Sequence, residues 1–258
     1  MDYDTLMTSE AEGVAVITLN RPEVMNALNK QMRAELTHAV KDLGARARVL
    51  VLTGAGRAFC SGQDLGDGGN AAQIDLERTL REEYEPMLRA IYDAPVPVIA
   101  AVNGSAAGAG ANLALAADVV IAAHSASFIQ AFTRIGLIPD AGGTYFLPRQ
   151  IGFARAMGTM LFADKISADQ AAEQGMIWQA VPDAEFAALW QDRARVLAHG
   201  PTIAYRNIRR ALRASLSNTL DAQLALEAQL QAEAGKTRDF QEGVLAFLEK
   251  RPARFEGR

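Results

Sequence analysis

Cysteine and histidine are scarce in this sequence. Cys60 is the one cysteine, so a single chain cannot form an internal disulfide, and the three histidines (His38, His124 and His199) show no HExxH or CxxC spacing. These shortages exclude disulfide-stapled folds and the usual zinc motifs. We therefore predict that the protein binds no metal and that it works in a reducing cytoplasm.

A long apolar run and a surplus of positive charge are also missing. The longest weakly polar run, residues 104–117, is mostly Ala and Gly and is shorter than the ~20 residues that span a membrane. The N-terminus is acidic and lacks the basic and apolar regions of a secretory leader. Lys and Arg total 26 against 30 Asp and Glu, a formal net charge of -4, which offers no general attraction to a phosphate backbone. We expect no membrane partner and no nucleic-acid partner.

Apolar residues are plentiful and follow alternating strand and helix patterns. The 258 residues are 50% hydrophobic, enough for a substantial core. Apolar runs rich in β-branched residues predict strands at four places: 14–19, 49–53, 96–102 and 119–123. Between the first two strands, helical spacing predicts a helix with Asn29 as its N-cap and Gly44 as its stop. The alternation predicts an α/β fold.

The composition changes near residue 199. Residues 199–258 are rich in Ala, Leu, Gln, Arg and Glu and carry no strand signal, so we predict a helical C-terminal subdomain after a core that spans residues 1–198. The subdomain has an apolar face that must pack on the core or on another subunit, formed by Phe240, Val244, Phe247 and Leu248.

Three glycine-rich segments are the candidates for chemistry. The patterns GxxxxGK[ST], GxGxxG and GxSxG are absent, so a phosphate loop and a serine nucleophile elbow are not supported. Residues 53–65 follow a strand, and residues 97–118 combine a strand, a turn and a helix of small residues. Tight turns and close packing would explain both segments. Alternatively, the two loops supply backbone N–H donors to one oxyanion.

The third segment, residues 134–148, contains Asp140 in an apolar and glycine-rich setting. Aspartate is a common N-cap of a helix. A carboxyl group in an apolar surround would instead have a raised pKa that suits it to moving protons. The segment by itself leaves both interpretations open.

Taken in order, these segments resemble the enoyl-CoA hydratase/isomerase (crotonase) superfamily over nearly the whole chain. The matching motifs are NRPEVMNAL at 20–28, GRAFCSGQDL at 56–65, AVNG at 101–104 and FLEKR at 247–251. The resemblance implies a ClpP/crotonase-like ββα spiral core with a helical C-terminal region, a homotrimer or dimer of trimers, and an acyl-CoA substrate. The C-terminal subdomain would serve oligomerisation and closure over CoA. No separate cofactor is implied, because CoA is part of the substrate.

Carried over residue by residue, the resemblance places an oxyanion hole on the backbone N–H groups of Gln63 and Ala109. The two hydratase glutamates fall on Asn112 and Phe132, which cannot take up a proton. Asp140 matches an aspartate of dienoyl-CoA isomerases. Because one carboxylate suffices to move a double bond by removing and returning a proton, the resemblance implies Asp140 as the acid/base.

The resemblance also implies positions that hold substrate and CoA, although ordinary surface or core packing is the competing interpretation for each. They are Arg21, Val24, Ala27, Ala58, Phe59, Ser61, Gly62, Asp64, Leu65, Gly110, Phe247 and Lys250, the last two reaching CoA from the same or a neighbouring subunit. Asp64 and Asp118 are interpreted as more structural than catalytic, and Cys60 as a small buried filler. Tyr145, Phe146 and Trp178 would line an aromatic pocket or pack in the core.

Further motifs narrow the resemblance to the isomerases of ring 1,2-epoxyphenylacetyl-CoA: AGAGA at 107–111, GLIPDAGGT at 136–144 and GMIWQ at 175–179. The implied activity is that of a 2-(1,2-epoxy-1,2-dihydrophenyl)acetyl-CoA isomerase, which forms oxepin-CoA in phenylacetate catabolism. The alternatives are a Δ3-Δ2-enoyl-CoA isomerase or an enoyl-CoA hydratase of fatty-acid β-oxidation. Residues 66–75 are expected to influence the pocket shape.

Two interpretations without catalysis stay open. Some crotonase relatives bind RNA through a lysine-rich helix, but in the matching helix here Glu35 and Asp42 offset Lys30, Arg33 and Lys41, so no basic face develops. The other interpretation is a catalytically silent CoA-binding subunit, which the absence of the two hydratase glutamates suggests.

Overall fold

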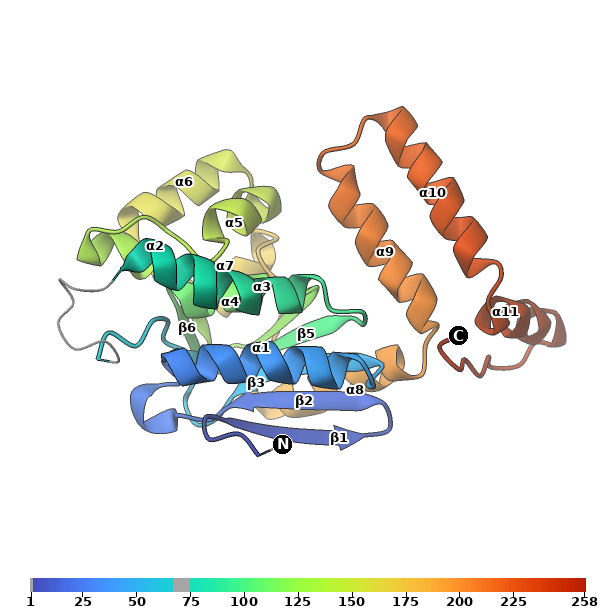
Figure 1. Cartoon of the computed structure of the whole chain (residues 1–258), viewed down its shortest axis with the longest axis horizontal. Helices are drawn as coiled ribbons and strands as arrows, with labels where there is room; N and C mark the ends of the chain where they lie inside the picture. The colour runs from blue at the N-terminus through green and yellow to red at the C-terminus, as the bar shows by residue number, and fades with distance from the viewer. Residues whose placement is uncertain (1, 67–74) are drawn as a thin grey trace.

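Two sheets form the centre of the molecule in the computed structural model, which describes residues 2–66 and 75–258 (Figure 1). In these ranges the larger sheet has six strands, in the order β1 (Leu6–Ala11), β2 (Val14–Leu19), β3 (Val49–Gly54), β5 (Val98–Val102), β7 (Val119–Ala123) and β10 (Gln179–Val181). β1 and β2 are antiparallel, and the other neighbours are parallel. The four strand predictions are confirmed.

The smaller sheet has four strands in the same described ranges, in the order β4 (Ala58–Cys60), β6 (Ser105–Ala107), β8 (Ser127–Ile129) and β9 (Ile166–Ser167). β4, β6 and β8 run parallel to one another, whereas β9 is antiparallel to β8. Because β4 and β6 are parallel neighbours, the loops that follow them leave from the same edge of the sheet. These are the first two glycine-rich segments.

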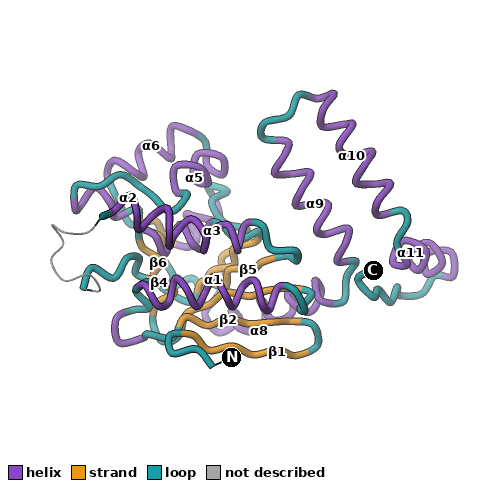
Figure 2. Tube along the Cα trace, viewed as in Figure 1, coloured by secondary structure: helices purple, strands orange, loops and turns teal. Residues whose placement is uncertain are grey.

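Helices join and cover the strands (Figure 2). Around the sheets they are α1 (Lys30–Gly44), α2 (Leu76–Thr79), α3 (Glu85–Tyr92), α4 (Ala109–Leu115), α5 (Gly143–Ile151), α6 (Phe153–Phe162), α7 (Ala168–Glu173) and α8 (Asp183–Ala198). A π-helical turn, Leu80–Tyr84, joins α2 to α3. The predicted first helix is confirmed with its cap, because the Asn29 side chain accepts a hydrogen bond from the Met32 N–H.

Both faces of the larger sheet are buried. In β3, Leu50 and Leu52 belong to the main apolar core that includes side chains of α1 and α3. Val49 and Val51 point to the other face and pack in a second cluster with Phe186 of α8. Alternate residues of a strand face opposite sides, so a continuous apolar run indicates a sheet covered twice. The α/β prediction is confirmed.

The C-terminal helices α9 (Thr202–Ser215), α10 (Leu220–Ala234) and α11 (Arg238–Glu249) extend to one side of the sheets (Figure 1). Arg209 and Arg213 of α9 form ion pairs with Asp118, at 2.7 and 2.8 Å, so the structural interpretation of Asp118 is confirmed. On α11, Phe247 is 83% exposed and Leu248 71% exposed. Within one chain their apolar face is therefore not packed on the core, and its role in oligomerisation stays a prediction.

A buried ion pair joins α1 to the π-helical turn. The guanidinium Nη2 of Arg33 lies 2.6 Å from Oε2 of Glu83, and the two side chains are 4% and 16% exposed. The Nη1 of Arg33 also donates to the carbonyl oxygen of Leu28. Arg33 is thus a structural residue of the interior and adds no charge to the surface of α1.

Replacing Arg33 by Leu should lower the free energy of unfolding by about 3 kcal/mol, because the carboxylate of Glu83 would remain largely buried without its partner. Denaturant titration at one protein concentration measures the loss. Arg46→Leu is the matched control, since Arg46 pairs with Glu10 where both side chains are largely exposed, and it should change stability little. Equal losses in the two variants would contradict the prediction.

Candidate active site

Glycines bring the first two segments into direct contact. A Cβ atom at Gly110 would lie 2.3 Å from the carbonyl oxygen of Cys60, and one at Gly62 would lie 2.8 Å from that of Ala107 and 3.4 Å from the backbone nitrogen of Ala109. Gly62 also has a φ of +96°, a conformation that favours glycine. These contacts set the N-terminus of α4 against the loop that follows β4.

Two backbone N–H groups are left without partners at this contact. The Leu28 N–H donates to the Gly62 carbonyl and the Asp64 N–H donates to the Leu28 carbonyl, at 2.8 and 3.2 Å. In such a bridge the N–H of the residue between them, Gln63, faces away from Leu28. Ala109 begins α4, where an N–H has no intrahelical acceptor. Neither N–H has a protein acceptor among the described residues, so both are available to a ligand.

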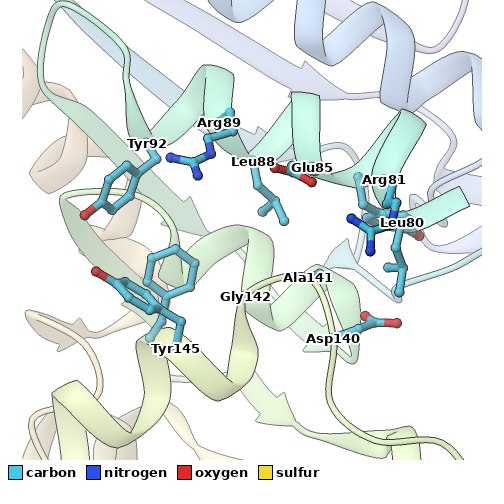
Figure 3. Close-up of a pocket in the computed structure, with 12 residues that line it drawn as sticks. Leu80, Arg81, Glu85, Leu88, Arg89, Tyr92, Asp140, Ala141, Gly142 and Tyr145 are labelled. Carbon is cyan, nitrogen blue, oxygen red and sulfur yellow. The ribbon is translucent and has the colours of Figure 1, made fainter. Parts of the chain in front are cut away.

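Asp140 lines a cavity of about 500 Å³ between α3 and α5 (Figure 3). It does not cap α5: the helix begins at Gly143, its N-cap is Gly142, and no side chain caps it. The capping interpretation is therefore wrong. Burial raises the pKa of the Asp140 carboxyl to about 6. A carboxyl group with this pKa can accept and return protons near neutral pH.

Asn112 and Phe132, the positions of the two hydratase glutamates, carry no titratable group. Asn112 is fully buried, and its side-chain nitrogen donates to the main-chain oxygen of Asp140 at 2.8 Å. Its side-chain oxygen accepts from Nε2 of Gln130, also at 2.8 Å. Phe132 is buried as well. Asn112 thus supports the loop that carries Asp140, and this interaction could not be predicted from the sequence.

Aromatic rings form the end of the cavity away from Asp140 (Figure 3). Tyr145 lies edge-on to Tyr92 and to Phe146, with ring centroids 6.5 and 5.4 Å apart. Tyr145 and Phe146 therefore line a pocket, as one of the two interpretations held. Trp178 is 68% exposed and is not among the cavity's lining residues.

The proposed CoA positions near the N-terminus gather in one place. Arg21 donates to Asp64 at 2.8 Å and to the carbonyl of Ala27 at 2.7 Å, and the Ser61 hydroxyl donates to the carbonyl of Val24. Residues 21–27 and the loop after β4 are thereby joined. Asp64 thus helps to join the two segments, and its contact with substrate or CoA stays a prediction.

The remaining predicted CoA positions divide by exposure. Leu65 is exposed, whereas Ala58, Phe59 and Gly110 are buried. Phe247 lies on α11 and Lys250 ends this helix, which is set apart from α3 and α5, the helices that line the cavity (Figure 1). Contact of these two residues with CoA, from the same or a neighbouring subunit, stays a prediction. Residues 67–74, part of the segment expected to influence the pocket, lie outside the described residues.

Cys60 is fully buried, and burial raises the pKa of its thiol to about 12. Its interpretation as a filler is confirmed. The described parts of the chain hold no group of three or more His, Cys, Asp or Glu residues placed to bind a metal. They also hold no helix long and apolar enough to cross a membrane.

The raised pKa of Asp140 predicts a pH-dependent rate. Only the ionised carboxylate can accept a proton, so kcat/KM should rise with pH through about 6 and level off above it. Initial rates between pH 5 and 8.5 in buffers of constant ionic strength measure this profile. A flat profile across that range would contradict a role for Asp140 as the base.

Comparisons with known proteins agree with this geometry. The model of the Enoyl-CoA hydratase/isomerase family matches residues 9–258. The chain is 65% identical, over the full length of both, to a Rhodobacter capsulatus protein named "Probable enoyl-CoA hydratase". It is 48% identical to the 1,2-epoxyphenylacetyl-CoA isomerase of Escherichia coli K12, with 98% of each chain covered. The crystal structure of an enoyl-CoA hydratase from Bacillus anthracis matches with a TM-score of 0.91 and 34% identity, covering 99% of this chain and 100% of that one.

These matches identify the molecule as an α/β enzyme of the crotonase fold with a helical C-terminal region, as the sequence predicted. The chain belongs to the enoyl-CoA hydratase/isomerase family, and the two relatives above are named as a hydratase and an isomerase of CoA thioesters.

Proposed function

We propose that this protein is an acyl-CoA isomerase in which Asp140 moves the proton. The observation that carries the proposal is the carboxyl group of raised pKa that Asp140 places in the cavity. The positions of the two hydratase glutamates hold the buried side chains of Asn112 and Phe132. Efficient hydration requires groups that activate and position a water molecule, and neither of these side chains can accept a proton from water.

The chemistry follows from the two sets of groups. The N–H groups of Gln63 and Ala109 would hold the thioester oxygen while Asp140 removes a proton from a carbon near the carbonyl. The electron pair of the broken C–H bond moves toward that oxygen and gives an enolate. Asp140 then returns the proton at another carbon, which shifts a double bond without net addition of water.

We further propose 2-(1,2-epoxy-1,2-dihydrophenyl)acetyl-CoA as the substrate and oxepin-CoA as the product, within phenylacetate catabolism. The bond between the two ring carbons that share the epoxide oxygen opens to give the seven-membered ring, and the proton that Asp140 removes from the carbon next to the thioester carbonyl is returned to a ring carbon, so the product is an isomer of the substrate. Two observations support this choice. Tyr92, Tyr145 and Phe146 offer aromatic surface to a ring at the end of the cavity. In addition, the Escherichia coli relative at 48% identity carries the name of this isomerase.

The test compares three substrates with the purified protein: the enzymatically generated phenylacetyl-CoA epoxide, a Δ3-enoyl-CoA and crotonyl-CoA. We expect conversion of the epoxide, measured by absorbance and by mass spectrometry without a gain of water. If the protein turned over the Δ3-enoyl-CoA alone, its substrate would be a fatty acyl-CoA and not the ring epoxide. No turnover of any of the three would favour the silent CoA-binding subunit.

A hydratase is the second candidate, because the relative at 65% identity is named as one. Besides Asp140, Glu85 of α3 is a carboxylate that lines the cavity within the described residues. Rapid hydration of crotonyl-CoA that is lost in Glu85→Gln would establish this alternative and assign water activation to Glu85.

We also propose that the exposed apolar face of α11 is covered by other subunits in a homotrimer or dimer of trimers. Phe247 and Lys250 would then reach CoA bound to a neighbour. We propose a cytoplasmic location as well, which fits the single buried cysteine. Light scattering of the purified protein measures the assembly, and a monomer would contradict it.

A further inference from the structure

Tyr84 connects the wall of the cavity to one of the two free backbone donors. It ends the π-helical turn Leu80–Tyr84, is 2% exposed, and lines the cavity with Asp140. Its hydroxyl donates to Oε1 of Gln63 at 2.6 Å. Burial raises the pKa of the Tyr84 phenol, so the hydroxyl remains a donor throughout the working pH range. No sequence motif marks this residue, which lies between a hydrophilic stretch and α3.

Gln63 is held from two sides. Its backbone is fixed by the two hydrogen bonds that Leu28 makes to its neighbours Gly62 and Asp64. The Gly62 carbonyl and the Gln63 N–H belong to one planar peptide and point to opposite sides of the chain, so the bond from Leu28 to Gly62 opposes a rotation that would turn this N–H away from a ligand. The bond from Tyr84 holds the Gln63 side chain on the cavity side and is a second restraint on the same residue.

Arg33 fixes Tyr84 and the bridge together. Its guanidinium lies 4.9 Å from the centroid of the Tyr84 ring. It also pairs with Glu83, the residue before Tyr84, and donates to the carbonyl of Leu28 at 2.6 Å. One buried cation therefore sets the positions of both groups that hold Gln63. A π-helical turn is uncommon and is often found at functional sites, and here it presents Glu83 and Tyr84 to Arg33.

We propose that Tyr84 is a positioning residue of the oxyanion hole, which acts through the Gln63 side chain to keep the Gln63 N–H directed at the thioester oxygen. The inference rests on the proposed function only in assuming that this N–H binds the thioester oxygen. It does not depend on which acyl group is bound, because Tyr84 contacts the donor and not the acyl chain.

A spectroscopic experiment tests the inference without turnover. Phenylacetyl-CoA has no ring epoxide or double bond to shift, and the C=O stretching frequency of its thioester falls when hydrogen bonds polarise the carbonyl. In wild type we expect the C=O frequency of the bound ligand to be lower than that of the free ligand. In Tyr84→Phe we expect the frequency of the bound ligand to move a substantial part of the way back toward the free value. Tyr3→Phe is the matched control, since it removes a hydroxyl bonded to His38 outside the cavity, and it should retain the full shift.

Kinetics separate positioning from a general structural role. Tyr84→Phe should lower kcat about tenfold, as expected for one hydrogen bond acting in the transition state, with KM within about twofold. Gln63→Leu removes the acceptor but keeps the backbone N–H. Tyr84→Phe should therefore cause no further loss in the Gln63→Leu background.

Each of the following results would overturn the inference. Losses that multiply in the double variant would mean that Tyr84 acts independently of Gln63. A lower melting temperature with an unchanged carbonyl shift would make Tyr84 merely structural. A wild-type carbonyl that is not shifted would overturn the oxyanion hole itself, and with it the proposed function. An active enzyme with a shifted carbonyl that Tyr84→Phe leaves unchanged would overturn the inference alone.

Discussion

Asp140→Asn should bind acyl-CoA esters like the wild type and lose isomerase activity by about 10³-fold. The amide has nearly the shape of the carboxylate but cannot accept the proton, and a positioned acid/base contributes rate factors of this order. Isothermal titration with phenylacetyl-CoA measures binding, and single-turnover kinetics measure the chemical step. Retention of full turnover would show that another group moves the proton.

The stability of the same variant gives an independent check. The pKa of Asp140 is raised in the folded protein, so ionising it costs stability as the pH rises from about 4, where an unfolded carboxyl titrates, through about 6. Asparagine has no such cost. Asp140→Asn should therefore unfold at a higher temperature than wild type above pH 6, whereas Asp169→Asn, at an exposed position on α7, should not.

Gly110→Ala should lower kcat by about 10²-fold or more. The added methyl group would lie 2.3 Å from the Cys60 carbonyl oxygen and 2.7 Å from its sulfur, so α4 must move away from the loop after β4. That movement separates the N–H groups of Ala109 and Gln63, and removal of one oxyanion donor alone has an effect of this size. Steady-state kinetics and a melting curve record both consequences.

Gly158→Ala is the control for this substitution. Gly158 lies within α6, and the nearest atom to an added Cβ is 4.0 Å away, so alanine fits and should stabilise the helix slightly. Its activity should be that of the wild type. If Gly110→Ala kept normal activity, the close contact between the two loops would not be needed for catalysis.

Local patterns in the sequence predicted the elements of the fold well. The β-branched runs predicted β2, β3, β5 and β7, and Asn29 marked the start of α1, because strand propensity and helix capping depend on neighbouring residues. The strand predicted from residue 96 begins only at Val98. The short strands β4, β6 and β8 lacked such a signal, since they have three residues each and consist mainly of small side chains.

The candidate site was predictable only in part. The motif around Asp140 indicated a functional carboxyl group, but the sequence alone could not separate a cap from a base, because that depends on where α5 begins. The bonds from Tyr84 to Gln63 and from Asn112 to the Asp140 main chain join residues 21 and 28 positions apart. Contacts of this kind depend on the tertiary fold, and the residue spacing of helices and strands does not predict them.

The attachment of α9 connects the C-terminal helices to the wall of the cavity. Arg213 lies over the ring of Tyr92, 3.8 Å from its centroid, and also pairs with Asp118. Tyr92 in turn forms part of the cavity wall. A mutation that shifts α9 should therefore move Tyr92 and change the shape of the cavity. One arginine thus couples the position of the C-terminal helices mechanically to the cavity wall.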